Sequence, residues 1–297
     1  MIADLRLAFR TLVKAPGFTC IAVLTLALGI GLSTSAFSLT NVLLFRSLPY
    51  PESERLVRVF RTTPQSQTSS IAPGNALDIR ANLTSFSQVG LFSYDSLSLA
   101  EPDQPAVQVN AVNFSANFLN LLGVAPVHGR LFAPDEDQLG KSNVVVITHR
   151  MWTRRFGSDP QVVGRTLRIN GESTTVIGIL PASFEAPLVW GPCDIVRPLT
   201  QQSTFPADRT NAWMGIVGRL RPGVSIEQAH SELRTIGAHL AQDHPKENGS
   251  DSLRATSLHD SNMDPVSRMI LWMMPVLSTM VLVIACANLA NLLLARS

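Results

Sequence analysis

Two long stretches without a charged residue dominate the pattern of apolar and polar positions. The first runs from Ala15 to Phe45 and the second from Met269 to Ala295. A helix of about 31 residues rises roughly 45 Å, more than the 30 Å or so of a bilayer's hydrocarbon core. We therefore predict that the chain spans a membrane twice.

A cleaved signal peptide is the main alternative for the first stretch. Its apolar core would be only about 7 to 15 residues long and would end at a small-residue cleavage site. Here the apolar positions continue through Leu39, Val42, Leu43, Leu44 and Phe45. A membrane span is therefore the better interpretation.

The segment between the spans alternates strand-like and helix-like patterns. Strands are expected in "RLVRVF", "AVQVNAV" and "NVVVIT", and a hairpin is expected to turn at Asn170-Gly171, a pair that suits a type I′ turn. Helices are expected over 115–123, over 149–157 behind a Thr148 cap, and over 225–240 behind a Ser225 to Gln228 capping box. The polar runs 62–70 and 244–252 are expected to be loops.

These patterns define the fold class and the domains. We predict a membrane protein in which two transmembrane α-helices flank an α+β domain, since about 220 residues can form a core of their own. The expected parts are an amphipathic helix over 1–17, a transmembrane helix over 18–45, the domain over 46–268 and a second transmembrane helix over 269–295.

Positive charges near the helix ends indicate the orientation. Arg6, Arg10 and Lys14 precede the first span and Arg296 follows the second, which favours both termini in the cytoplasm. Four arginines early in the segment between the spans argue for the opposite orientation: Arg46, Arg55, Arg58 and Arg61. They carry less weight, because a long loop can cross the membrane despite its charges.

The first fourteen residues form a basic amphipathic pattern, with Arg6, Arg10 and Lys14 four residues apart. Such a helix lies on a membrane surface. It is either a topology signal and lipid anchor or a docking element for a cytoplasmic partner. These three side chains are therefore candidate contacts for lipid or for an ATPase.

Small and polar residues inside the spans indicate helix packing. Ala27, Gly31 and Ser35 recur every four residues, a pattern that lets a neighbouring helix approach closely. Asn288 and Asn291 place amides on one face of the second span, where each interhelical hydrogen bond contributes about 0.6 kcal/mol. The alternative for these amides is contact with lipid headgroups.

The sequence gives no sign of catalytic chemistry. In "DEDQLGKS" the Gly-Lys-Ser resembles the end of a phosphate-binding loop, but Asp135 occupies the first glycine position and neighbouring carboxylates would repel phosphate. The six histidines form no metal or nucleophile motif, and "GIGLST" lies in a membrane span rather than after a strand. We therefore predict no catalytic site, metal site or cofactor in this chain.

Charge and cysteine content exclude two further features. A net charge of +2 with mixed signs leaves no basic stripe for nucleic acid. Only Cys193 lies outside the spans, so the domain has no internal disulfide. If Cys193 is exposed, a membrane-impermeant thiol reagent is expected to label it.

Several segments together resemble the MacB/FtsX-like permeases of ABC transporters, in particular their duplicated orphan group. The resemblance rests on "DLRLAFRTLVKAPGFTCIAVLTLALGIGLSTSAFSLTNVLLFRSLPYPESERLVRV" at the N-terminus, on "NFSANFLNLLGVAPVHGRLFAPDED" and "VGRLRPGVSIEQAHSELRTIGAHL" in the domain, and on "VLVIACANLANLLLARS" at the end. The domain is similar to the family's periplasmic core domain, and the last segment to the start of an FtsX-like membrane module.

The resemblance implies a permease subunit in the bacterial inner membrane with its large domain in the periplasm. It implies that a separate ABC ATPase hydrolyses ATP and that the helices pass the motion to the domain, for export or efflux. Further permease helices, a second permease copy in a dimeric assembly, and a periplasmic adaptor or outer-membrane channel are the implied partners. The chain would then be the N-terminal portion of such a permease, either a fragment or a truncated gene product.

Two other classes of protein share this outline. A two-span receptor has a sensor domain between two helices, but it would continue into a signalling helix and an output domain. A membrane-anchored periplasmic enzyme would need a catalytic constellation, which the sequence does not offer.

Overall fold

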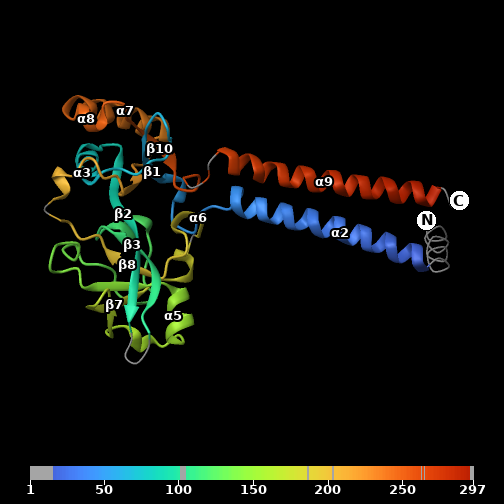
Figure 1. Cartoon of the computed structure of the whole chain (residues 1–297), viewed down its shortest axis with the longest axis horizontal. Helices are drawn as coiled ribbons and strands as arrows, with labels where there is room; N and C mark the ends of the chain where they lie inside the picture. The colour runs from blue at the N-terminus through green and yellow to red at the C-terminus, as the bar shows by residue number, and fades with distance from the viewer. Residues whose placement is uncertain are drawn as a thin grey trace. The chain divides into compact units, whose positions relative to one another are not determined.

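The computed structural model describes residues 16–100, 105–185, 187–202, 204–261, 263 and 265–294. The chain divides into two compact units, one of residues 1–46 with 263–297 and one of residues 47–262 (Figure 1). The expected helix over 1–17 lies almost wholly outside the described residues.

The first unit is a pair of long antiparallel helices. Helix α2 (Pro16–Thr40) continues into a π-helical turn, η1 (Asn41–Phe45), and packs against α9 (Pro265–Leu294). The stretches Thr19–Phe45 and Val266–Asn291 are long and apolar enough to cross a membrane. Only 11% and 6% of their most apolar windows is buried, which distinguishes them from the core helices of a soluble domain.

A mixed sheet organises the second unit. Among the described residues it has ten strands, in the order β10-β1-β9-β2-β3-β8-β5-β7-β4, with β6 pairing with β2 and β7. Two pairings, β3 with β8 and β5 with β7, are parallel, and the others are antiparallel. The strands are β1 (Leu56–Thr62), β2 (Phe86–Ala100), β3 (Val107–Phe114), β4 (His128–Gly129), β5 (Val144–Ile147), β6 (Thr166–Ile169), β7 (Glu172–Ile179), β8 (Ile195–Pro198), β9 (Gly215–Leu220) and β10 (Ser252–Ser257).

Helices cover both faces of this sheet, and α7 with α8 lies near β1 and β10 (Figure 1). The helices are α3 (Pro73–Asn82), α4 (Phe118–Leu122), α5 (His149–Phe156), α6 (Pro187–Trp190), α7 (Ile226–Asp243) and α8 (Pro245–Asn248). Short 3₁₀ turns lie at Ser53–Arg55, Pro160–Val162, Ala182–Phe184 and Phe205–Ala207.

Alternation along the strands supplies a core on each face of the sheet. Leu91 and Ile216 pack in the cluster that holds α3 and α7, whereas the next residues, Phe92 and Val217, pack in the cluster under α4 and α6. Successive side chains of a strand point to opposite faces, so a sheet covered on both sides buries nearly continuous apolar runs.

The helix caps and the hairpin turn predicted from the sequence are confirmed. Thr148 accepts a hydrogen bond from the Met151 amide at the start of α5, and Ser225 with Gln228 forms the expected capping box of α7. The β6–β7 hairpin turns at Asn170 and Gly171, whose φ angles are 50° and 84°. Helix α4 is shorter than expected, and part of the expected loop over 244–252 forms α8.

Gly215 on β9 makes room for the largest aromatic cluster of the domain. It pairs with Phe92 on β2, and a Cβ atom at this position would lie 2.3 Å from two ring atoms of Phe92. The Phe92 ring meets those of Phe118 and Trp190 edge to face, at centroid distances of 5.8 and 5.5 Å. The ring is therefore held from several sides and cannot simply turn away.

We predict that Gly215→Ala lowers the free energy of unfolding by about 1–3 kcal/mol, the usual cost of overpacking a core. Chemical denaturation of the full chain in a neutral detergent measures this change. In a Phe92→Leu background, which lacks the ring, the same substitution is expected to cost clearly less. Equal losses in the two backgrounds would contradict this account of Gly215.

Candidate functional site

Small side chains line the face of α2 that packs against α9. Ala22 and Ala36 are buried there, and a Cβ atom at Gly29 would lie 2.9 Å from Leu282 Cδ1. Small residues let two helix backbones approach closely where lipid supplies no hydrophobic drive between helices. The two helices are therefore in tight contact along this face.

Hydroxyl groups on α2 hydrogen-bond to the backbone of α9. Ser33 Oγ donates to the Ser278 carbonyl at 3.2 Å, and Thr40 Oγ1 donates to the Leu271 carbonyl at 3.0 Å. Thr40 is only 3% exposed. The pairing of residues 29, 33 and 40 with 282, 278 and 271 follows an antiparallel register.

The Leu271 carbonyl is available to Thr40 because a proline follows it in α9. Pro275 lies inside α9 and has no N–H, so the Leu271 carbonyl four residues earlier has no intrahelical donor. A membrane interior offers no water to replace that donor. Thr40 supplies it from the neighbouring helix, so the break in α9 and the polar residue in α2 complement each other.

The helix geometry changes directly after Thr40. The Arg46 amide donates to the Asn41 carbonyl at 3.1 Å, which makes 41–45 a π-helical turn. Beside it, Phe45 and Trp272 meet edge to face with ring centroids 5.7 Å apart. Proline breaks and π-turns are the usual points at which helices bend. Both helices thus have a bendable position at the same end of the pair.

The structure places the predicted packing residues away from this contact. Ala27, Gly31 and Ser35 are exposed, and a Cβ atom at Gly31 would meet nothing within 4 Å. They are two residues out of step with Gly29 and Ser33, which is about 200° around a helix. Helix α2 therefore has small residues on two opposite faces, and contact of the second face with another helix stays a prediction.

The other predicted contacts are not made within the described chain. Asn288 and Asn291 of α9 are exposed, so their amides do not face α2. Arg6, Arg10 and Lys14 lie outside the described residues. Their roles also stay predictions.

Tyr50 anchors the start of the second unit in its core. Its side chain is buried, its hydroxyl donates to the Phe184 carbonyl at 2.8 Å, and it accepts from Trp190 Nε1 at 2.7 Å. Burial holds the pKa of the Tyr50 hydroxyl above its usual range. The sequence analysis missed this residue, which the motif "SLPYP" presents as part of a turn.

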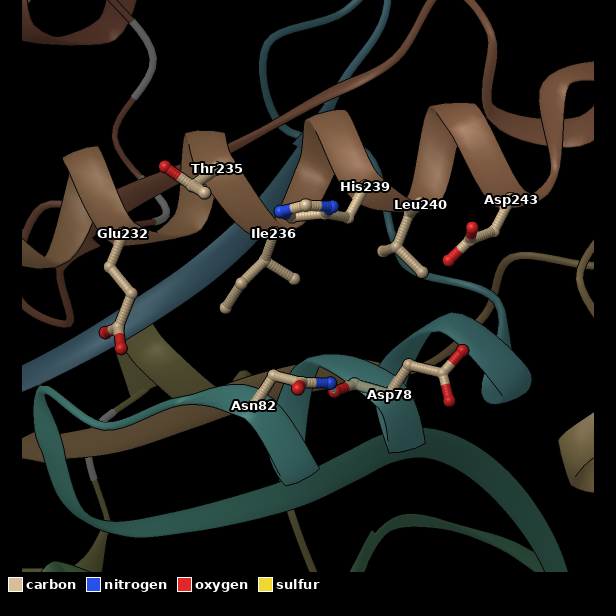
Figure 2. Close-up of a pocket in the computed structure, with 8 residues that line it drawn as sticks. All are labelled: Asp78, Asn82, Glu232, Thr235, Ile236, His239, Leu240 and Asp243. Atoms are coloured by element: carbon tan, nitrogen blue, oxygen red, sulfur yellow. Dashed lines mark hydrogen bonds between the residues drawn. The ribbon is translucent and has the colours of Figure 1, made fainter.

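A groove of about 690 Å³ lies between α3 and α7 in the same unit. Figure 2 shows Glu232, Ile236 and Leu240 extending from α7 toward α3, with Asp78 and Asn82 below them. Its carboxylates invite a comparison with catalytic or metal sites.

Two of the carboxylates that line the groove, Asp78 and Glu232, are already engaged. Asp78 pairs with Arg209 at 2.8 Å, and Glu232 accepts from the Thr84 amide and hydroxyl at 2.7 and 2.6 Å. Burial alone would raise the pKa of Glu232, but the hydrogen bonds from Thr84 and Ser85 outweigh it and hold that pKa below the usual value. Glu232 therefore fastens α7 to the segment before β2.

The Gly-Lys-Ser segment forms an acidic turn rather than a phosphate loop. Lys141 Nζ pairs with Asp135 at 2.7 Å, and Arg130 pairs with Glu136 at 2.6 Å. The next element is strand β5, whereas a phosphate loop opens into a helix. Among the described residues, no group of three or more His, Cys, Asp or Glu side chains could hold a metal ion.

Cys193 is buried, so the expected labelling of an exposed thiol does not apply to it. Its exposed fraction is 6%, and burial raises the pKa of its thiol to about 12. The thiol stays protonated and covered in the folded domain, so it is no probe of membrane topology.

The sequence profile of the MacB-like periplasmic core domain family matches residues 19–236. The match covers most of the 297 residues and runs from α2 into α7. The chain belongs to this family. No curated protein sequence matches it.

Solved structures of MacB-like domains share the fold. A domain of a permease protein from Porphyromonas gingivalis aligns with 75% of this chain and 99% of its own length, with a TM-score of 0.54 and 18% identity. The periplasmic region of MacB from Actinobacillus actinomycetemcomitans aligns with 77% and 97%, with a TM-score of 0.53 and 14% identity. The predicted fold class is confirmed: two apolar helices flank an α+β domain of the MacB-like periplasmic type.

The Thr40 bond in this MacB-like chain can be tested by a double-mutant cycle. Thr40→Val removes the donor at nearly constant shape, and we expect it to lower the stability of the helix pair by about 1 kcal/mol. In a Pro275→Ala background the residue-275 amide can satisfy the Leu271 carbonyl, so Thr40→Val should then cost almost nothing.

The measurement is the unfolding free energy of the helix pair in mixed detergent micelles. Thr40→Ser, which keeps the hydroxyl, is the matched control and should stay close to the unmodified chain. Equal losses from Thr40→Val in both backgrounds would show that the hydroxyl does not serve the carbonyl freed by Pro275.

Proposed function

We propose that this chain is the membrane-spanning permease subunit of an ABC-type transporter in the bacterial inner membrane. It relays motion driven by a separate ATPase to its periplasmic domain, in export or efflux. The observation that carries the proposal is the continuous family match over residues 19–236, which includes a membrane helix and most of the domain.

The helix pair supports a role in transmitting motion. Pro275 interrupts the backbone bonding of α9, and a π-turn follows Thr40 in α2. A single interhelical hydroxyl bond compensates this break, so two arrangements of the pair can differ by little free energy. Such an element can respond to a force applied at the cytoplasmic ends.

The proposal assigns the energy source to a separate ATPase. The sequence has no Gly-x-x-x-x-Gly-Lys-Ser/Thr run, and Lys141 of its only Gly-Lys-Ser is paired with Asp135. A partner ATPase would meet the cytoplasmic side, where Arg6, Arg10 and Lys14 are candidate contacts for it or for lipid.

Further membrane helices are the expected neighbours of the exposed small face. Ala27, Gly31 and Ser35 form this face on α2, and Asn288 and Asn291 add exposed amides on α9. The occupant would be additional permease helices or a second permease copy in a dimer. A periplasmic adaptor or an outer-membrane channel would complete an export pathway. The alternative of a two-span receptor draws no support from the family match.

The ATPase proposal predicts that the purified chain hydrolyses no ATP above background. In a full-length permease, reversing Arg6 and Arg10 to glutamate should weaken recruitment of the ABC ATPase several-fold, because a basic contact becomes acidic. Co-purification from membranes, followed by an ATP hydrolysis assay of the eluate, measures both quantities.

The matched control reverses Arg154 and Arg234, two exposed arginines of the domain, and should leave recruitment unchanged. A periplasmic reporter in the 62–70 loop verifies that topology is preserved in each variant. Hydrolysis by the isolated chain would contradict the proposal, and unchanged recruitment with preserved topology would make the N-terminal helix a lipid anchor only.

Substitutions at two glycines of α2 can distinguish helix packing within the chain from helix packing between chains. Gly31→Leu enters open space in this chain, so we expect it to leave the α2–α9 pair intact and to weaken association with other permease helices. Gly29→Leu would collide with Leu282 and should loosen the pair itself.

Disulfide trapping between introduced cysteines measures the α2–α9 pair, and crosslinking in membranes measures association. Ile30→Leu, an exposed substitution of equal volume, is the control for membrane insertion. Full association of the Gly31→Leu variant would show that the Ala27, Gly31 and Ser35 face is not an interface.

A further inference from the structure

A short turn, residues 51–55, lies just before β1 in the second unit. Tyr50 before it and Leu56 after it are both buried in the core cluster under α4 and α6. Pro51 and Glu52 within it are exposed. This turn, which we call the entry turn, is therefore fixed at both ends, while the residues between reach the surface.

Arg219 of β9 attaches the entry turn to α4. Its Nη1 donates to the carbonyls of Pro51 and Glu52 at 2.9 and 3.2 Å. Its Nε and Nη2 both donate to the Leu121 carbonyl, at 3.0 and 2.9 Å. One guanidinium group thus joins the exposed turn to the last turn of a helix in the core.

Helix α4 depends on this attachment for its position. It has five residues, and a helix of that length has little stability of its own. The Leu121 carbonyl lies in its last turn, where a helix leaves carbonyls without intrahelical donors. Gly123 ends α4 with a φ angle of 72° and lies against the entry turn, because a Cβ atom there would be 3.1 Å from Pro51 Cγ.

The other end of α4 carries Phe118 into the aromatic cluster. The Phe118 ring stacks on that of Phe114 with centroids 4.0 Å apart, and it meets Trp190 edge to face at 5.6 Å. A shift of α4 would therefore disturb the packing of these three rings.

The backbone of Glu52 opposes the closed arrangement. Its φ and ψ angles are 48° and 46°, a left-handed conformation that is strained for glutamate. Such strain persists only where the surrounding contacts hold it. Burial also lowers the pKa of the Arg219 guanidinium below its usual value, because water no longer fully solvates the charge. Opening of the turn would therefore relieve strain and rehydrate a charge.

We propose that the entry turn is a latch that opens and closes together with α4, with Arg219 as the positioning residue that couples the two. In the closed state Arg219 holds the end of α4, and Phe118 stays in the aromatic cluster. In the open state the guanidinium turns to water, the Leu121 carbonyl loses its donors and α4 loosens, while the sheet stays folded. Every residue involved lies in the second unit, so the latch does not depend on the transport function proposed above.

A matched pair of variants at position 52 biases the latch without touching α4. Glu52→Gly and Glu52→Ala both remove the carboxylate that pairs with Arg55, but only glycine adopts a positive φ angle without strain. The latch should therefore stay closed more often in Glu52→Gly. We expect amide exchange at residues 53–55 to be about fivefold slower in Glu52→Gly than in Glu52→Ala.

Hydrogen exchange of the full chain in a neutral detergent, followed by mass spectrometry, supplies the readout. The Arg55 amide donates to the Glu52 carbonyl at 3.0 Å and reports on the latch. The amides of Leu121 and Val124 donate to backbone carbonyls of α4 and its N-cap and report on the helix. If α4 opens with the latch, these two amides should slow by the same factor. The amides of α5 are the internal reference and should exchange equally in all variants.

An Arg219→Gln background shows whether this arginine carries the coupling, because the difference at Leu121 and Val124 should then disappear. If Arg219→Gln does not fold, Arg219→Lys, which replaces the planar fork with a single ammonium group, takes its place. Equal exchange of the two position-52 variants at the latch or at α4 would overturn the proposal. A difference at α4 that persists without Arg219 would also overturn it.

Discussion

The helix pair depends on one constraint, the need to satisfy every backbone polar group in a medium without water. Pro275 leaves the Leu271 carbonyl without an intrahelical donor, and the Thr40 hydroxyl of α2 replaces that donor at 3.0 Å. This bond and the contact of Gly29 with Leu282 belong to the same antiparallel register between the helices. The position at which α9 lacks an intrahelical hydrogen bond is therefore also a position at which α9 accepts a hydrogen bond from α2.

In the MacB-like domain, the packing of the core depends in a similar way on one aromatic cluster. Phe92, Phe118 and Trp190 meet edge to face, and Gly215 provides the space that the Phe92 ring requires. Tyr50 joins the same core through its bond to Trp190 Nε1. Tyr50 lies near the start of this unit in the sequence, so the beginning of the domain is fastened directly to its core.

Charged residues contribute to the tertiary structure of the domain. In the groove between α3 and α7 they hold elements together, as the bonds of Glu232 to Thr84 and of Asp78 to Arg209 show.

The sequence by itself determined the two spans, the α+β class and the elements with strong local signals, such as the Ser225 capping box and the Asn170 turn. These features depend on neighbours within a few residues, which sequence spacing records. The spacing of small residues also indicated that α2 packs closely against another helix. It pointed to the face of Gly31, whereas the contact with α9 uses the face of Gly29. Which of the two small faces of α2 meets α9, and which carbonyl the Thr40 hydroxyl bonds to, were decided by tertiary structure, because each contact joins residues far apart in the chain.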